Sequence, residues 1–431
     1  MVKKNALASA IATSMLAAVA VGNAHAVTVD FNGQGQVLLG PVYMVDNGHN
    51  TVIRVANTST TQAVKAKLVL RSKIDSQECR DIILYLTPTD VASVTLGDAG
   101  DGKNATVTSN DDSVVASMNG TTPVFATATA GYSSKTVTSR LVRSSDTCQV
   151  GHIEVVGAYA ASGTIVTPEG NTVAIRQGMS KNDLYKVFKS SDDVGAAFTH
   201  AQLNTLNPGL LPSANVNSLL GLVDIQKTDG SDRTSITMTA LRNDVAAPLI
   251  DNAAFDVSVG TDTLIGASNW TVAGNSLANI EAALGTTALN AIYDNTATDK
   301  TNLIVTFPTK YRYLTSRTAL TYSAPFQSNG SYMYGRSSYD QSENSGTSVG
   351  CFESPCSTTS NVYITDEVNY IYASDMKING EDFFFATLNS GDKTGKGWAR
   401  LNLAGNPGVA AVLGYTHRFS GTQSVVNAMA R

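Results

Sequence analysis

The sequence predicts a mainly β protein built from two antiparallel β-sandwich domains, the second with short helical insertions and a long loop. Several short segments alternate apolar and polar side chains with a period of two, which is typical of half-buried strands. Turn-forming residues separate these segments at short intervals, as in antiparallel sandwiches. The chain has 431 residues, enough for two or three domains, and only 15% of them are charged. Polar uncharged residues must therefore cover much of the surface.

Residues 1–26 have the three parts of an export signal. A start with two lysines precedes a short apolar stretch, and Ala24-His25-Ala26 fits the small-x-small cleavage pattern. We therefore expect an exported protein, found at the bacterial cell surface or outside the cell, whose mature chain begins at Val27. Beyond this segment the sequence has no apolar run long enough for a membrane-spanning helix.

Residues 27–163 are expected to form the first sandwich. In Val64–Arg71 the apolar side chains at alternate positions share one face, and Lys65, Lys67 and Arg71 lie on the other. The same alternation occurs in Val52–Ala56, Ile82–Leu86, Val91–Leu96 and Ile153–Val156. The Gly-rich, strand-like segment Val27–Leu39 is a candidate for insertion into the sheet of a neighbouring subunit, because an extended segment can complete a free sheet edge.

Residues 164–431 are expected to form the second domain, a sandwich interrupted by helices and a loop. Ser180 can cap a helix whose Leu184, Val187 and Phe188 share one face. Further helical patches are predicted around Phe198–Leu206, at Leu277–Leu284 and at Ala288–Tyr293. Strands are predicted at Ser235–Leu241, Leu303–Phe307, Val362–Tyr372, Asp382–Leu388 and Gly397–Leu403. The Ser-, Gly- and Tyr-rich segment Ser323–Ser360 is expected to be a long ordered loop.

The four cysteines are expected to form two disulfides in an oxidising compartment. Cys351 and Cys356 enclose a short segment with a turn-favouring proline, so we pair them and join Cys79 to Cys148. A zinc site at Cys148 and His152 is the alternative, but the spacing and the exported context favour disulfides.

Two acidic loops are candidate calcium sites. Asp98 and Asp101 form one pair and Asp229 and Asp232 the other, each with glycines that permit tight turns. Neither completes the EF-hand spacing with a trailing glutamate, so ordinary turns are the favoured interpretation. No other cofactor is expected.

The sequence offers little catalytic equipment. Ser348 stands in a Gly-x-Ser-x-Gly pattern, but its surroundings are a loop and not the strand-turn-helix that a nucleophile elbow requires. His152 and Glu154 share one strand face, which would suit a salt bridge or a metal site. For His49, His152, His200 and His417 we favour places on the surface or at the edge of the core over roles as ligand or base. We therefore expect the protein not to be an enzyme.

Four aromatic residues are candidate contact residues. Tyr332, Tyr334, Tyr339 and Trp398 could stack on a glycan or a partner, with core packing and loop anchoring as the alternative. The formal net charge of −5 argues against nucleic acid as a partner, because a polyanion needs a basic surface. Val412–Phe419 is similar to a closing strand of an outer-membrane barrel, but the sequence lacks the repeated ten-residue amphipathic strands of that class.

Several short segments together resemble a poorly characterised group of exported bacterial surface-layer-like proteins. These segments are Leu39–Tyr43, Thr51–Ser59, Tyr85–Val91, Val305–Lys310 and Gly397–Leu401. Tyr339–Glu343 is similar to a more charged segment of that group. The resemblance implies a cell-surface protein of sandwich domains and carries no catalytic residues.

The function that these observations favour is that of a non-enzymatic cell-envelope subunit, which self-assembles into a surface layer or a filament. Low charge suits close packing of identical subunits, because it limits their mutual repulsion. The partner would be a second copy of the chain, with an envelope anchor or a glycan as a further partner. The alternatives are a surface adhesin or glycan-binding module, a secreted hydrolase and an outer-membrane barrel.

Overall fold

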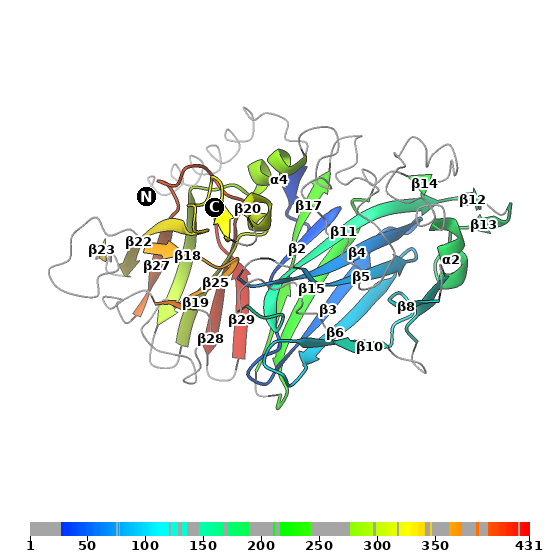
Figure 1. Ribbon diagram of the computed structural model, residues 1–431, viewed down its shortest axis with the longest axis horizontal. Helices are drawn as coiled ribbons and strands as arrows, with labels where there is room; N and C mark the ends of the chain where they lie inside the picture. Colours follow the sequence, from blue (N-terminus) through cyan, green and yellow to red (C-terminus); the bar gives the residue numbers. More distant parts are fainter. Residues whose placement is uncertain are drawn as a thin grey trace, which may run out of the picture.

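The computed structural model describes residues 27–431 except 75, 77, 120–121, 128–131, 136–145, 168–169, 189–209, 212–215, 231, 244–275, 296–298, 317–318, 341–344, 347–361, 373–384, 388–394 and 421–422. Strands dominate these residues, which confirms the predicted mainly β class, and the sheets are open (Figure 1). The signal predicted at residues 1–26 and the helix predicted around Phe198–Leu206 lie outside the described residues.

Two sheets form the first sandwich. Sheet A has the order β1 (Val27–Asp30), β17 (Thr239–Asn243), β2 (Val37–Met44), β11 (Val150–Ser162), β4 (Gln62–Ser72) and β5 (Glu78–Leu86), with β14 (Leu210–Leu211) on β11. Sheet B has the order β10 (Tyr132–Lys135), β7 (Ala105–Ser109), β6 (Val91–Asp98), β3 (His49–Asn57), β15 (Leu219–Lys227) and β16 (Arg233–Thr237). The hairpins β8 (Val115–Asn119)–β9 (Thr122–Phe125) and β12 (Thr164–Val166)–β13 (Thr172–Ala174) and helix α2 (Lys181–Phe188) are added at one end.

The second sandwich also has two sheets. Sheet F has the order β18 (Ala288–Asn295), β27 (Gly395–Asn402), β22 (Tyr332–Asp340) and β23 (Ser345–Gly346), with β24 (Val362–Ile364) on β22. Sheet G has the order β26 (Phe385–Thr387), β25 (Val368–Tyr372), β19 (Asp299–Thr306), β28 (Leu413–Ser420) and β29 (Gln423–Ala428). Helix α4 (Ser276–Leu284), the 3-10 turn η5 (Lys310–Tyr313) and the hairpin β20 (Leu314–Ser316)–β21 (Thr321–Tyr322) complete this part.

The two sandwiches have the same strand order. In sheet A the order is β17-β2-β11-β4-β5, and in sheet F the strands β18-β27-β22-β23 correspond to β2-β11-β4-β5. The place of β17 is taken in sheet F by Ala430, which forms a β-bridge to Asn290 of β18. Sheet B contains β6-β3-β15-β16, and sheet G contains β25-β19-β28-β29. In both sandwiches these strands also occur in the same order along the chain. The protein therefore contains one sandwich topology twice, here called the first repeat (37–243) and the second repeat (288–430).

Details of hydrogen bonding agree with this equivalence. The Thr51 hydroxyl accepts from the Met44 N–H at 3.0 Å and donates to its carbonyl at 2.7 Å across the β2–β3 hairpin. In the β18–β19 hairpin, the Thr301 hydroxyl bonds the N–H and carbonyl of Asp294 at 2.9 and 3.2 Å. Each repeat also has a bend at a methionine. The Met238 N–H donates to the Gly221 carbonyl at 3.0 Å, and the Met429 N–H donates to the Gly414 carbonyl at 2.8 Å.

The four sheets stack in the order B, A, G, F. Along β19, Leu303 and Val305 face the core of the second sandwich, whereas Ile304 joins the apolar cluster of the first. The Thr306 hydroxyl donates to the Pro41 carbonyl of β2 at 2.6 Å. The outer face of sheet G therefore packs on the outer face of sheet A. In Figure 1 sheet G lies between sheet F, at the left end, and the first sandwich.

The sheet pairing corrects two expectations about the first domain. The boundary expected near residue 163 falls inside the first sandwich, because β15, β16 and β17 return to pair with β3 and β2. The segment Val27–Leu39, a candidate for insertion into a neighbour, pairs within its own chain. Its β1 part pairs with β17, and β2 lies between β17 and β11.

Local predictions for residues 164–431 have mixed outcomes, and α2, expected in the second domain, belongs to the first repeat. Helices α2 and α4 confirm the predicted helical segments, and the Ser180 hydroxyl accepts from the Asp183 N–H at 3.1 Å as the cap of α2. Ala288–Tyr293 was expected to be helical, but it is part of β18, where Leu289 and Tyr293 point into the core and pairing with β27 overrides local preference. The loop expected at Ser323–Ser360 contains β22, which pairs with β27.

Candidate functional site

A buried cluster of charged residues joins the two repeats. On the outer face of sheet A, Arg71 Nε donates to Glu154 Oε2 at 2.8 Å, and His152 Nε2 lies 3.6 Å from the other oxygen of Glu154. From the second repeat, the ring centroid of Tyr311 in η5 lies 3.9 Å from the Arg71 guanidinium carbon. Glu367, just before β25, places Oε1 3.9 Å from His152 Nδ1. The sequence placed Arg71 on a polar strand face, and the second repeat covers that face.

Burial sets the protonation of this cluster. It raises the pKa of Glu367 to about 8 and lowers the pKa of His152. Burial also opposes ionisation of Glu154, but the adjacent Arg71 and His152 together outweigh it, and the pKa of Glu154 is lowered. At neutral pH the cluster therefore holds the ion pair Arg71–Glu154 beside a neutral His152 and a protonated Glu367.

This cluster is suited to joining the repeats, not to catalysis. Arg71, His152, Glu154 and Glu367 are at most 1% exposed, so a substrate cannot reach them. His152 and Glu154 do share one strand face, as predicted, but His152 is fully buried and not at the surface. The cluster lies where η5 and the Glu367 turn of the second repeat meet sheet A.

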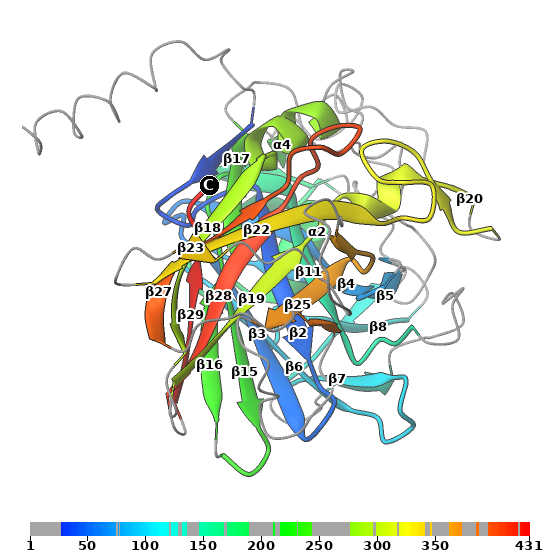
Figure 2. The same cartoon turned by 90° about the vertical axis from the view of Figure 1, so that its left-hand side faces the viewer.

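The outer face of sheet F is exposed and partly apolar. Ile292 on β18 is 82% exposed and Trp398 on β27 is 42% exposed, and these two residues are direct cross-strand partners. The backbone of Tyr339 on β22 lies opposite Trp398 on its other side. Asp294 is bonded by Lys396 at 2.8 Å and by Arg418 at 2.6 Å at the border of this face. Figure 2 shows β18, β27 and β22 from this end of the molecule.

The outer face of sheet B is the free surface at the other end of the stack. Its strand β3 alternates buried and half-buried residues, with Val52 and Arg54 on the outer side. Val91, at the start of β6, is 46% exposed. Asp224 is held between Arg54 and Arg233, with Arg233 Nη2 at 3.1 Å. This face is therefore mixed, with apolar side chains around one ion cluster.

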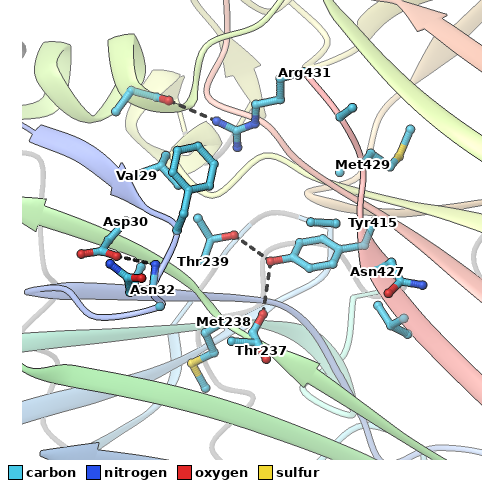
Figure 3. A pocket seen from close by; sticks show the side chains of 18 of the residues that line it. Val29, Asp30, Asn32, Thr237, Met238, Thr239, Tyr415, Asn427, Met429 and Arg431 are labelled. Atoms are coloured by element: carbon cyan, nitrogen blue, oxygen red, sulfur yellow. Dashed lines mark hydrogen bonds between the residues drawn. The ribbon is translucent and has the colours of Figure 1, made fainter. Parts of the chain in front are cut away.

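A groove of about 740 Å³ lies beside the contact between the repeats (Figure 3). Its walls come from β1, from the bend between β16 and β17, and from β28, β29 and α4. The Tyr415 hydroxyl lies 2.7 Å from Thr239 Oγ1 and donates to the Thr237 carbonyl at 3.4 Å. Phe31, which is 99% exposed, stands at the rim. The volume is that of a small-ligand pocket.

The charged residues of the groove are held by the protein itself. Arg431 donates to the carbonyl oxygens of Ala283 at 3.1 Å and Val412 at 2.7 Å. Asp30 accepts from the Arg242 guanidinium at 3.2 Å and from the Asn32 N–H at 2.6 Å. The groove can therefore offer shape, apolar surface and backbone groups to a ligand.

The predicted calcium loops have the bonding of ordinary turns. Asp98 accepts from the Gly100 N–H at 2.8 Å and from the Gln149 amide at 2.7 Å. Asp101 accepts from the N–H groups of Lys103 and Asn104 at 3.0 and 2.7 Å. Asp232 accepts from the Ser424 hydroxyl at 2.8 Å, and Asp229 lies at the tip of the β15–β16 hairpin. Within the described residues, no group of three or more His, Cys, Asp or Glu side chains is placed to hold a metal ion.

One of the two predicted disulfides is present in the described part of the chain. Cys79 of β5 is bonded to Cys148, with Cα atoms 5.7 Å apart, so this pairing is confirmed and Cys148 is not a zinc ligand. Cys351, Cys356 and Ser348 lie outside the described residues, and so does His200. His49 and His417 are each 8% exposed, so they are more buried than a surface position implies.

The structure separates the four aromatic candidates. Tyr332 and Tyr334 are 1% and 2% exposed and belong to the core of the second sandwich, so they cannot stack on a ligand at the surface. Their rings face inward because alternate positions of β22 point into the sandwich. Trp398 is accessible to solvent, and the backbone of Tyr339 lies directly opposite it on the neighbouring strand.

Sequence reasoning missed Ile292 and Phe31 as surface residues. Ile292 lies in a segment interpreted as helical, where Leu289, Ala291 and Tyr293 at alternate positions were the available strand signal. Neither helix in the described part of the chain combines the length and apolarity that a membrane crossing requires.

Comparison of this chain with protein-family models, with curated proteins and with solved structures gave no match.

Proposed function

We propose that the protein is a non-enzymatic structural subunit that self-assembles at the bacterial cell surface. The observation that carries this proposal is the exposed pair Ile292 and Trp398 on the outer face of sheet F. Large apolar side chains that adjoin on one sheet face lose contact with water when a partner covers them, and such patches are typical of interaction surfaces.

Two further observations support a structural role. The charged cluster around Arg71 is closed to solvent and lies at the contact between the repeats. Its role in joining the repeats explains why these charged side chains are buried. The Cys79–Cys148 disulfide suits a protein that works outside the cytoplasm. The predicted export signal would bring the mature chain there.

Electron microscopy tests this proposal. Negative-stain images of the purified mature chain, and of intact cells that produce it, are expected to show regular sheets or filaments. Purified protein that shows isolated particles of one chain, together with cells that carry no ordered array of it, would contradict the proposal.

A second candidate function is that of a surface binding module, and the groove favours it. Its volume of about 740 Å³ and its largely uncharged lining, in which Asp30 and Arg431 are held by the protein's own groups, suit a glycan or a short extended peptide. Tyr415 lies in the middle of this groove. A glycan array probed with the mature chain and with a Phe31→Ser variant tests this function, because binding at the groove should weaken when the exposed rim residue is removed.

A further inference from the structure

The repeated topology makes each sheet of the first repeat equivalent to a sheet of the second. Sheet A corresponds to sheet F, and sheet B corresponds to sheet G. Within the chain, the outer face of sheet G covers the outer face of sheet A. Among the residues that the structure describes, the faces left free are the outer face of sheet F and the outer face of sheet B. These are the equivalents of the two faces that already contact each other.

Register connects sheet A to sheet F residue by residue. On sheet A, His152 pairs with Arg71, and on sheet F the equivalent strands pair Trp398 with Tyr339. His152 is fully buried beneath the second repeat, whereas Trp398 is 42% exposed. Ile292, beside Trp398, is 82% exposed. The outer face of sheet F thus exposes the large apolar side chains of Ile292 and Trp398. The equivalent positions on sheet A are buried beneath the second repeat.

The same comparison holds for sheets B and G. Val91 pairs with Ala56 at the start of β6, and Val368 pairs with Thr306 at the start of β25, so the two valines are equivalent. Val368 has no exposed surface and belongs to the cluster at the contact with the first repeat, whereas Val91 is 46% exposed.

The turns before these strands also correspond. The Asn57 N–H donates to the Asp90 carbonyl at 2.8 Å, and the Phe307 N–H donates to the Glu367 carbonyl at 2.9 Å. Glu367 belongs to the part of the second repeat that closes over His152. The turn before β6 in the first repeat therefore corresponds to the Glu367 turn of the covering surface, whereas η5 has no counterpart between β3 and β4.

We propose that a second copy of this chain places the outer face of its sheet B on the outer face of sheet F, repeating between chains the contact that joins the two repeats within a chain. This inference rests on the proposed self-assembly and specifies its geometry. The contact is heterologous, because different faces meet, so each added chain leaves the same two faces free. The product is an open row or filament of stacked sheets and not a closed dimer.

The charges of the two faces predict how salt affects this contact. On sheet F, Asp294 is flanked by Lys396 and Arg418. On sheet B, Asp224 is flanked by Arg54 and Arg233. Each of these clusters has one more positive than negative charge, so they repel weakly when the faces approach. Salt screens that repulsion and should strengthen association while the apolar contact is retained.

Two exposed positions allow the contact to be broken from either side. Ile292→Asp alters sheet F and Val91→Asp alters sheet B, and neither side chain is needed in a core. Each change removes an apolar side chain from the contact and adds a carboxylate that must lose hydration there, which should weaken association by more than about tenfold. Val425→Asp is the matched control, because Val425 is 54% exposed on β29, outside sheets B and F.

Sedimentation velocity of the full mature chain, with circular dichroism as a check on folding, decides between the outcomes. Wild type and Val425→Asp should form long rows, and Ile292→Asp and Val91→Asp should each stay monomeric. A mixture of these two variants should form heterodimers and nothing longer, because one intact face of each kind remains. Rows formed by Ile292→Asp as readily as by wild type would overturn this geometry but leave self-assembly standing. A monomeric wild type would refute both.

Discussion

Replacing Glu367 with glutamine tests the account of the buried cluster between the repeats. The side chain of Glu367 has no exposed surface, and burial raises its pKa from 4.5 to about 8. Between these values the folded protein holds a proton that the unfolded chain has released. The stabilisation is therefore complete below the unfolded pKa and is lost as pH rises through the folded pKa.

The size of this effect follows from the shift. One pKa unit corresponds to about 1.4 kcal/mol, so the change in the Glu367 pKa gives a loss of about 5 kcal/mol in the free energy of unfolding across this pH range. Glu78, whose pKa burial and the adjacent Asp81 also raise to about 8, adds a loss of the same sign. Burial lowers the pKa of His152 and lowers that of His417 to about 3, so these two histidines add gains of stability as pH rises toward 6.5. Glutamine has the shape of the protonated acid and does not titrate. Glu367→Gln should therefore abolish the part of the pH dependence that Glu367 causes.

Urea unfolding followed by circular dichroism between pH 5 and pH 8 measures this dependence. As pH rises through this range, the free energy of unfolding of wild type should fall relative to that of Glu367→Gln, because only wild type releases the Glu367 proton. Asp183→Asn is the control, because the Asp183 side chain is 44% exposed and far from the cluster in sequence. Equal slopes for wild type and Glu367→Gln, or a wild type that gains stability relative to the variant as pH rises, would refute this reasoning.

Two further predictions concern stability within each repeat. Cys148→Ala, which opens a disulfide spanning 69 residues, should lower the free energy of unfolding by about 4 kcal/mol, and a variant as stable as oxidised wild type in chemical unfolding would contradict this. Thr51→Val and Thr301→Val should each cost about 1–2 kcal/mol, because each leaves a buried hairpin N–H and carbonyl without the hydroxyl. If the two hairpins are equivalent, the two losses of stability should be similar, and thermal unfolding of both variants can compare them.

The sequence was most informative where one side of a strand faces a core. The alternation in Val64–Arg71 placed β4 correctly, and the capping pattern at Ser180 placed α2. It could not show that the polar side of β4 is covered, because Arg71 is buried by η5 of the second repeat, far away in the chain. Local patterns carry no information on such long-range contacts.

The repeated topology was also hidden from the sequence. Equivalent positions carry different residues because their environments differ. His152 is buried beneath the second repeat, whereas Trp398 is exposed to solvent, and Asp294 is paired with Lys396 and Arg418, whereas its equivalent Met44 is apolar. The residues shared between the repeats are few, such as Thr51 and Thr301 in the hairpins and Met238 and Met429 at the bends. Strand pairing reveals the equivalence, and pairing between distant strands is what single-sequence patterns predict least well.

For the candidate site, the sequence identified Trp398 but grouped it with Tyr332 and Tyr334, which are in the core. Their separation depends on which face of the sheet each strand position occupies. That assignment required the register of β22 against β27, which places Trp398 opposite Tyr339.

The most direct test of the central claim is the mass of the purified mature chain in solution as its concentration is raised. Sedimentation velocity should show a series of species that grows in steps of one chain, with larger species favoured by added salt. A single species with the mass of one chain at every concentration and salt level would contradict self-assembly.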